Sequence, residues 1–400
     1  MKVYEINIVC GKRSTGRIVT DIYHSILEGG GKCRIAYGRY KTNLSINAIK
    51  VTNDFEVYFH ALMTRLTGRH GLFSNNATKR LIEDIRQFDP DIIHLHNIHG
   101  YYLNYKLLFE FFKKYNKPIV WTLHDCWSFT GHCAHYDSIG CEKWKRQCNK
   151  CENINAYPVS FIDNSKNNYQ LKKKLFTEIS KLTIVTPSKW LKDELKFSFL
   201  KEKRVEEIVN GIDLFKFSPS ESDFREKHKI EHKKMLLGVA SSFGAKKGFY
   251  DFIKLKELLN EDYVVCLVGL TKKQLKQLPE GIIGIEKTDS IKQLAEIYST
   301  ADIFLNLTYQ DTFPTTNIEA LACGTPVLTY ATGGSPSIID DTCGRIVEKG
   351  NLFEVVEEIK RMIKNPLEKQ ACIKRSKIFD RKLMGKNYVS LFKQLIKEKN

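Results

Sequence analysis

Two carboxylates, Asp311 and Glu319, lie eight residues apart in the stretch YQDTFPTTNIEALACGTPV (309–327). Asp311 follows the apolar run 301–307, which predicts a strand, and residues 315–317 are typical of a helix N-cap, with Glu319 expected in the first helical turn. Carboxylates accept hydrogen bonds from sugar or ribose hydroxyls, and the unpaired N–H groups of a helix N-terminus hold phosphate. The stretch therefore predicts a site for a phosphorylated, polyhydroxylated ligand, and points to a nucleotide-sugar.

A second candidate is the loop SSFGAKKG (241–248), which joins the expected strand 235–241 to a helix. Lys246 and Lys247 at such a junction can reach a diphosphate as point charges. A lysine pair is also a common feature of solvated surface. The functional interpretation gains its weight from the two carboxylates expected in the same domain.

The loop 10–23, CGKRSTGRIVTDIY, follows the first expected strand and opens a helix. Gly16 allows a close backbone approach to a ligand, and Ser14 and Thr15 can cap the helix. The spacing of Gly and Lys excludes a P-loop and a dinucleotide fingerprint. A substrate loop and an ordinary strand-to-helix turn remain equal alternatives.

Histidines gather at the ends of two expected strands, in HLHNIHG and WTLHD. His94 and His96 are either packed polar residues or two ligands of a metal site for which the spacing supplies no third ligand. His124, beside Asp125, is the better candidate for chemistry, because an imidazole at a strand's carboxyl end can orient a hydroxyl or stabilise charge.

Five of the eleven cysteines fall within the polar insertion 126–151. Its last four read C-x7-C-x6-C-x2-C and are Cys133, Cys141, Cys148 and Cys151. Four thiolates with a closing C-x2-C pair are typical of structural zinc, while free thiols or disulfides are the alternatives. Cys126, His132 and His135 are substitute ligands. A zinc site here would shape the loop beside His124 without entering the reaction.

Apolar runs alternate with amphipathic stretches along all 400 residues, which predicts an α/β class with two doubly wound, Rossmann-like domains facing across a cleft. The expected strands are 3–10, 33–38, 91–97, 118–125, 183–188, 235–241, 263–269, 282–286, 302–307 and 326–330. The segment 209–222 contains an Asn-Gly pair and a proline, which are typical of a linker, and we expect it to separate the domains. We expect an N-terminal domain over 1–208, a C-terminal domain over 209–375, and a last helical segment, 376–400, that packs back toward the first domain.

The composition is 42% hydrophobic and 27% charged, with a formal net charge of +17. This charge suits phosphorylated small molecules or an anionic membrane surface, and no nucleic-acid-binding motif accompanies it. The stretch 56–73 mixes apolar and basic residues and suits docking to anionic lipid. Neither a signal peptide nor a membrane-spanning run is expected, so the predicted location is the cytoplasm, with peripheral contact at the inner face of the cytoplasmic membrane.

Asp311-x7-Glu319 followed by ALACGTPV resembles the E-x7-E region of retaining glycosyltransferases of family 4, which have the GT-B fold. STGRIVTDIY, HLHNIHGYYLN, WTLHDCWSFTGHC, the Cys-rich insertion and NGID extend the resemblance over nearly the whole chain. Together they are similar to a bacterial branch of colanic-acid-type exopolysaccharide transferases.

The resemblance implies an N-terminal acceptor domain and a C-terminal nucleotide-sugar domain. By position, Glu319 would bind the donor ribose, Asp311 the hexose, and Lys247 the leaving phosphate. Further donor-binding positions would be Gly16, Ser242, Lys246, Thr312, Phe313, Thr315, Thr316 and Asn317. The acceptor would contact Arg17, His99, Tyr101 and His124. The implied acceptor is a saccharide or a lipid-linked saccharide. No DxD pair lies near the donor loop, so we expect no metal in catalysis.

Three residues depart from the family pattern. Asp311 stands where the first Glu is usual, Ser242 where an Arg is common, and Pro314 where Gly is common. These departures leave a catalytically silent nucleotide-sugar-binding or carbohydrate-binding scaffold as an alternative, and a nucleotide-sugar epimerase of the same architecture is another. The choice between UDP- and GDP-linked donors stays open.

Overall fold

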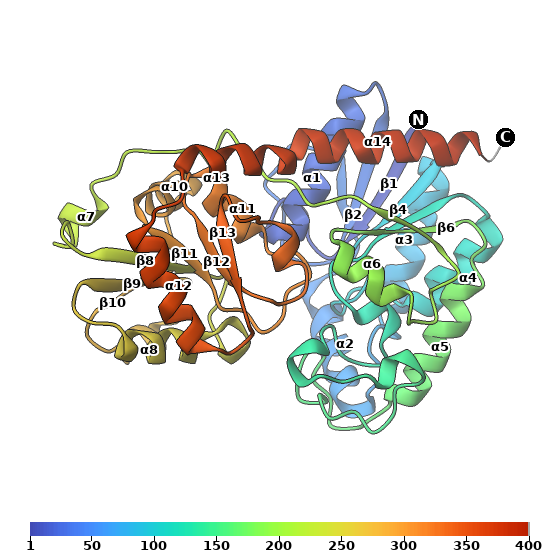
Figure 1. Cartoon of the computed structure of the whole chain (residues 1–400). Coiled ribbons are helices and arrows are strands. Elements are labelled where there is room, and N and C mark those ends of the chain that lie inside the picture. The colour runs from blue at the N-terminus through green and yellow to red at the C-terminus, as the bar shows by residue number, and fades with distance from the viewer. Residues whose placement is uncertain (399–400) are drawn as a thin grey trace. The chain divides into compact units, whose positions relative to one another are not determined.

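The computed structural model describes residues 1–398 and divides the chain into two compact units (Figure 1). The first unit comprises Met1–Asn210 and Lys382–Asn400, and the second is Gly211–Arg381. The chain thus leaves the first unit after Asn210 rather than after 208, and returns to it after Arg381 rather than after 375.

The first unit is built on a seven-stranded parallel sheet in the order β3-β2-β1-β4-β5-β6-β7. Its strands are β1 Lys2–Asn7, β2 Lys32–Tyr37, β3 Ala48–Lys50, β4 Ile92–Leu95, β5 Ile119–Thr122, β6 Leu182–Thr186 and β7 Arg204–Glu207. Its helices are α1 Arg13–Glu28, α2 Asp54–Thr67, α3 Asn75–Phe88, α4 Tyr105–Tyr115, α5 Ser165–Thr177, α6 Lys189–Leu195 and α14 Arg381–Lys397, with 3-10 turns η1 Trp127–Phe129, η2 Asp137–Ile139 and η3 Lys143–Lys145.

Helices cover both faces of this sheet, as near-continuous apolar strands require. Successive residues of β1 point to opposite faces: Tyr4 and Ile6 pack into the core under α3 and α4, while Val3 packs under α1 and α14. Helix α14 is fixed there by a hydrogen bond between Tyr388 Oη and Thr122 Oγ1, 2.9 Å long.

The second unit holds a six-stranded parallel sheet in the order β10-β9-β8-β11-β12-β13. Its strands are β8 Lys234–Val239, β9 Tyr263–Val268, β10 Ile282–Ile285, β11 Ile303–Asn306, β12 Val327–Tyr330 and β13 Gly344–Val347. Its helices are α7 Phe224–Lys227, α8 Phe249–Leu258, α9 Lys272–Leu275, α10 Ile291–Thr300, α11 Thr315–Ala322, α12 Leu352–Lys364 and α13 Lys369–Ser376, with 3-10 turns η4 Ala245–Lys247, η5 Ser335–Ser337 and η6 Lys377–Phe379.

The two doubly wound parallel sheets confirm the predicted α/β class. Every expected strand is present, but β3, β7 and β13 were missed, and all three lie at a sheet edge. Edge strands are short and partly solvated, so they lack the apolar run by which a buried parallel strand is recognised.

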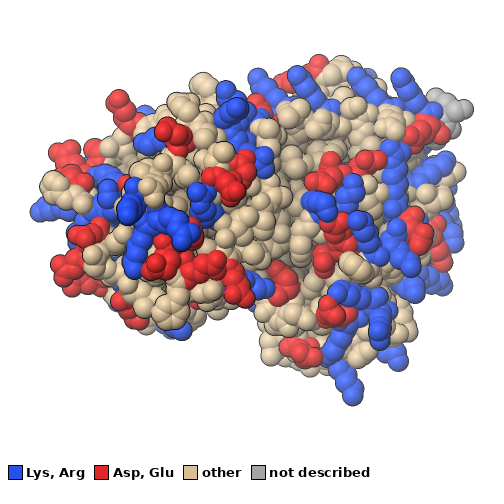
Figure 2. All heavy atoms as spheres, in the orientation of Figure 1, with Lys and Arg blue, Asp and Glu red and all other residues tan. Residues whose placement is uncertain are grey.

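No helix within residues 1–398 is long and apolar enough to cross a bilayer. Figure 2 shows Lys and Arg side chains interspersed with Asp and Glu over the face that it displays. Among the described residues visible on that face, the basic side chains do not form one continuous stripe of the kind that follows a nucleic-acid backbone.

Candidate active site

In the second unit, Lys247 and Asp311 form an ion pair, with 2.7 Å between Lys247 Nζ and Asp311 Oδ2. Lys247 ends η4, in the loop after β8, and Asp311 lies in the loop after β11. Lys247 Nζ also donates to the carbonyl oxygen of Gln310 at 3.4 Å. Because β8 and β11 are parallel neighbours, their carboxyl ends bring these loops together at one edge of the sheet, where ligands of such folds bind.

Close backbone packing fixes the same loops. Gly248 has φ +73°, and a Cβ there would stand 2.2 Å from the carbonyl oxygen of Leu307. Gly333, in the loop after β12, has φ +51°, and a Cβ there would stand 1.7 Å from the carbonyl oxygen of Asp311. Asp311 Oδ1 in turn accepts the backbone N–H of Phe313 at 3.1 Å. Three strand-end loops therefore hold the Asp311 carboxylate in place.

Helix α11 begins earlier than expected, because residues 315–317, which were expected to cap the helix, already lie within it. Pro314 is the N-cap residue and provides no side-chain cap, so Thr315 to Asn317 form the first helical turn. Glu319 consequently lies in the second turn, and its expected place in the first was wrong. The N–H of Asn317 donates to the carbonyl oxygen of Pro314 at 3.2 Å, so an anion at this helix start would be held by the N–H groups of Thr315 and Thr316.

Glu319 is nearly buried, and its Oε2 accepts a hydrogen bond from Tyr298 Oη at 3.0 Å. Tyr298 is fully buried on α10. Burial first, and the Glu319 carboxylate second, raise the pKa of Tyr298 well above its ordinary value, so it remains a hydrogen-bond donor at any physiological pH. Asp311 and Glu319 thus have different partners, although one short segment carries both.

The other expected donor residues differ in their accessibility. Thr315 and Thr316 are half-buried at the start of α11, whereas Thr312 and Phe313 are buried. Asn317 is fully buried and accepts a hydrogen bond from Asn306 Nδ2, so its side chain braces the loop from inside. Ser242 is exposed, and the backbone oxygen of Lys246 accepts the N–H of Tyr309.

In the first unit, His124 and His99 lie at the carboxyl ends of β5 and β4 and line one small cavity with Asp125. His124 Nε2 is 3.0 Å from His96 Nδ1, and the two rings stack at 5.3 Å. Burial lowers the pKa of His124 to about 4, although the Asp125 charge acts in the opposite direction. His124 is therefore neutral at pH 7.

The Asp125 carboxylate forms a hydrogen bond with His99, in addition to lying next to His124 in the sequence. His99 Nε2 is 2.8 Å from Asp125 Oδ2, and His99 Nδ1 is 2.8 Å from Tyr157 Oη. Burial acts to raise the pKa of Asp125, but the charge and hydrogen bond of His99 outweigh it and hold that pKa at about 2. Tyr101, also expected at this site, has φ 69° and contacts the Tyr157 ring edge-on at 5.9 Å.

Gly16 and Arg17 lie in the first turns of α1, where Arg17 is exposed and Gly16 is buried. Lys12 is the N-cap of α1, so the expected capping by Ser14 or Thr15 was wrong. A Cβ at Gly16 would stand 3.0 Å from Val9 Cγ2. Gly16 therefore allows helix α1 to pack closely against Val9 of the same chain.

Two family models match the chain: "Glycosyltransferase Family 4" over residues 47–215 and "Glycosyl transferases group 1" over residues 220–379. One relative is WcaC of Escherichia coli K12, which is named as a colanic acid biosynthesis glycosyl transferase. It is 27% identical to this chain over 382 residues, and the alignment covers 89% of this chain and 90% of WcaC. The chain belongs to the GT-B glycosyltransferases.

Solved structures agree on the fold. Sucrose-phosphate synthase from Thermosynechococcus elongatus has a TM-score of 0.72 at 14% identity and covers 99% of each chain. Anabaena HepE in complex with UDP-glucose has a TM-score of 0.68 at 15% identity, covering 98% of this chain and 100% of HepE. At these identities the likeness establishes the GT-B fold alone.

Sequence reasoning missed one buried acid in this glycosyltransferase. Glu5, on β1, pairs in register with His94 on β4, and its Oε1 is 3.2 Å from His94 Nδ1. Glu5, His94 and His96 bring three ligand-type atoms within 4.8 Å of one another, so the statement that the two histidines lack a third partner was wrong. Burial raises the pKa of Glu5 and lowers the pKa of both histidines, which favours three neutral side chains.

Proposed function

We propose that the protein transfers a hexose from a UDP- or GDP-linked donor to a saccharide acceptor, with retention of configuration, in bacterial exopolysaccharide or capsule synthesis. The observation that carries this proposal is the placement of Lys247, Asp311 and the open start of α11 at one sheet edge. The similarity to WcaC supports the polysaccharide context, and the UDP-glucose complex of HepE supports a nucleotide-sugar donor.

On the donor side, Lys247 and the first-turn N–H groups of α11 would hold the diphosphate. Their charge and dipole are fixed before the reaction, so they would stabilise the negative charge that develops as the nucleoside diphosphate departs. Asp311, held beside Lys247, would accept a hydrogen bond from a hexose hydroxyl, and Glu319 would accept one from a ribose hydroxyl.

On the acceptor side, the neutral imidazole of His124 would orient a hydroxyl. His96 fixes the ring from one side, so the orientation of His124 is set before the acceptor binds. In this proposal the acceptor hydroxyl attacks from the face that the leaving group vacates, and a donor phosphate oxygen takes its proton. Retention then needs no nucleophile from the protein, and no step uses a metal ion.

A lipid-linked acceptor is supported by the outer face of α2. Five large apolar side chains on this helix are exposed: Phe55, Tyr58, Phe59, Leu62 and Leu66. Their spacing places them along one side of the helix. The acidic Glu56 is neutralised by Arg80 at 2.7 Å, and Arg65 in the last turn adds positive charge. An apolar face beside basic residues suits the surface of an anionic membrane, so we propose peripheral association at the cytoplasmic face.

The test is a panel of UDP- and GDP-sugars. Binding of a matching donor raises the melting temperature, and release of nucleoside diphosphate after addition of a lipid-linked saccharide reports transfer. Analysis of the anomeric configuration of the product tests retention. Binding without turnover in both wild type and Glu319→Ala would support a silent scaffold instead, and conversion of the donor without acceptor would support an epimerase.

A further inference from the structure

The connection between β5 and α5, residues 123–164, contains no strand or α-helix and only the 3-10 turns η1, η2 and η3. Irregular segments of this length are uncommon in compact domains, because few backbone hydrogen bonds hold their shape. This segment carries Cys133, Cys141, Cys148 and Cys151. All four are free thiols, so no disulfide replaces the missing backbone ladder.

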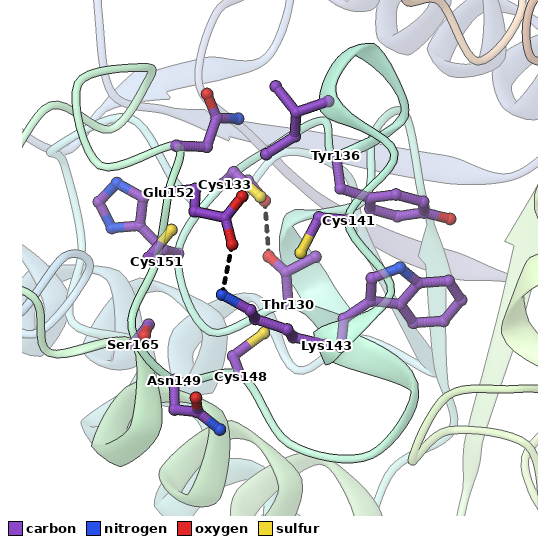
Figure 3. Close-up of a pocket in the computed structure, with 14 residues that line it drawn as sticks. Thr130, Cys133, Tyr136, Cys141, Lys143, Cys148, Asn149, Cys151, Glu152 and Ser165 are labelled. Atoms are coloured by element: carbon purple, nitrogen blue, oxygen red, sulfur yellow. Dashed lines mark hydrogen bonds and ion pairs between the residues drawn. The ribbon is translucent and has the colours of Figure 1, made fainter.

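The four cysteines line one cavity, whose free space measures about 20 Å³. Figure 3 shows their sulfur atoms arranged around this space from separate turns of the loop. A cavity of this size accommodates one water-sized particle, which matches a single ion rather than an organic ligand. Trp144 and Tyr136 form part of its wall.

A buried lysine, Lys172, lies next to this cavity. Lys172, on α5, is 1% exposed; its Nζ donates to the carbonyl oxygens of Trp127 at 2.6 Å and Thr130 at 3.0 Å and lies 3.4 Å from the centre of the Trp127 ring. Within the described residues it forms no ion pair with a carboxylate. Thr130 also lines the cavity, so the ammonium lies one residue away from it. A buried ammonium is costly, so burial lowers the pKa of Lys172 well below its ordinary value, and a negative charge nearby would offset that cost.

Three further groups, from Gly131, His132 and Lys143, lie at the cavity or contact one of its cysteines. The backbone N–H of Gly131 donates to Cys148 Sγ at 3.2 Å, a bond that stabilises a thiolate. His132 lines the cavity and is 3% exposed, and its Nε2 has no hydrogen-bond partner among residues 1–398. Lys143 reaches across the opening to Glu152 at 2.6 Å (Figure 3).

We propose that Cys133, Cys141, Cys148 and Cys151 bind one structural Zn²⁺ as thiolates. On binding, four S–H bonds break, four Zn–S bonds form and four protons leave to solvent. The resulting group carries a net charge of −2, and the basic side chains of Lys172 and Lys143 lie next to the cavity. This chemistry accounts for the four thiols, the cavity and the buried lysine beside it together.

The sulfurs must move closer together to bind the ion. Among the described residues, the only set of three ligand-type atoms already within 4.8 Å of one another is Glu5, His94 and His96. Rotation of the cysteine side chains toward the cavity would close the shell, and bond formation supplies the free energy for it.

The ion would act on the reaction only through the loop. Tyr157 follows the last cysteine in this segment and bonds His99, which bonds Asp125. A zinc-ordered loop therefore keeps the His99–Asp125 pair in place. This role is separate from the proposed sugar transfer, since metal content is measured without any substrate.

The test is metal analysis of the full-length protein purified from zinc-supplemented cells. We expect about one zinc per chain, and cobalt-loaded protein should show the intense visible and near-ultraviolet bands of a tetrahedral four-sulfur site. Cys148→Ala and Cys151→Ala should lose most of the metal. Cys266→Ala, which removes a buried thiol from β9 in the second unit, should retain it.

Two results would overturn the proposal. One is wild-type protein that binds no stoichiometric zinc after reduction and loading. The other is a cobalt spectrum with a nitrogen ligand, together with zinc loss in His132→Ala and retention in Cys141→Ala, which would show a different ligand set. If a cysteine variant fails to fold, displacement of zinc from folded wild-type protein by a thiol-blocking mercurial, read with a colorimetric indicator, answers the same question.

Discussion

Lys247 and Asp311 form an ion pair of 2.7 Å that joins the loop after β8 to the loop after β11. The two side chains are 37% and 23% exposed, and pairs so open to solvent contribute only about 0–1 kcal/mol to stability. The pair therefore does little to hold the second unit together. Its consequence is positional, because it fixes an ammonium beside the open N-terminus of α11, where a diphosphate would bind.

Replacing Lys247 by Ala should lower kcat by about 100- to 1,000-fold, since one fixed donor to the developing charge is lost. The melting temperature should change little, for the reason given above. The measurement is nucleoside diphosphate release together with a thermal melt. Lys254→Ala, an exposed lysine on α8, is the matched control and should behave as wild type. A Lys247→Ala enzyme within threefold of wild type, about 0.6 kcal/mol, contradicts the assigned role.

Glu319→Gln separates charge from packing. The amide oxygen still accepts from Tyr298, so the fold should be kept, while loss of the charged hydrogen bond to the donor should lower kcat/KM about 10- to 100-fold. Tyr298→Phe should do the reverse. It leaves a buried acceptor with one bond fewer, so stability should fall by about 1–3 kcal/mol with a smaller kinetic effect. Equal kinetic losses in both variants would show that Glu319 acts only in packing.

The pH profile reports on His124. Its pKa of about 4 in the folded protein, lowered by burial, means that the neutral ring persists down to about pH 5. If the neutral form orients the acceptor, kcat/KM should show no inflection from this group between pH 5.5 and 8 (about one to four units above that pKa). A wild-type inflection near pH 6.5 that vanishes in His124→Asn would show instead that the ring titrates as it does in water.

Glu5→Gln should stabilise the protein, and increasingly so as pH rises. The folded state keeps Glu5 protonated, because burial raises its pKa, whereas the unfolded chain ionises it above its model value of 4.5. Above pH 4.5 the wild type thus loses stability relative to the variant, at a rate approaching about 1.4 kcal/mol per pH unit, and below it the two should converge. Chemical denaturation at pH 4, 6 and 8 measures this. Greater stability of the wild type at pH 8 would mean that Glu5 is ionised and compensated.

Membrane docking through α2 predicts a loss of vesicle binding in the double variant Phe55→Ser and Phe59→Ser. Each exposed aromatic contributes roughly 1.5–3 kcal/mol when fully buried in an apolar phase, so the partition coefficient should fall at least tenfold. Co-sedimentation with anionic phospholipid vesicles measures it. Phe353→Ser is the control, since Phe353 matches Phe55 at 78% exposure but lies on α12 of the second unit. An equal loss in the control would leave α2 with no special part in docking.

Much of the fold follows from local pattern. The buried parallel strands are short apolar runs, and the helices between them are amphipathic, so class and strand positions could be predicted. The exceptions have a common cause. In β7, residues Arg204–Glu207 read RVEE, and in β13 Gly344–Val347 read GRIV, so edge strands with charged side chains facing water resemble loops in sequence.

The sequence by itself determined which residues could do chemistry. The type of a residue, such as a carboxylate, a lysine or a cysteine, fixes its reactivity, and its spacing from its neighbours predicts the local structure around it. Only the tertiary structure decided their partners. Asp311 meets Lys247 because β8 and β11 are adjacent, and Glu319 meets Tyr298 because α10 packs on α11. Glu5 meets His94 because β1 lies beside β4. Strand order and helix packing arise from burial over the whole chain, and residues far apart in sequence carry no local sign of it.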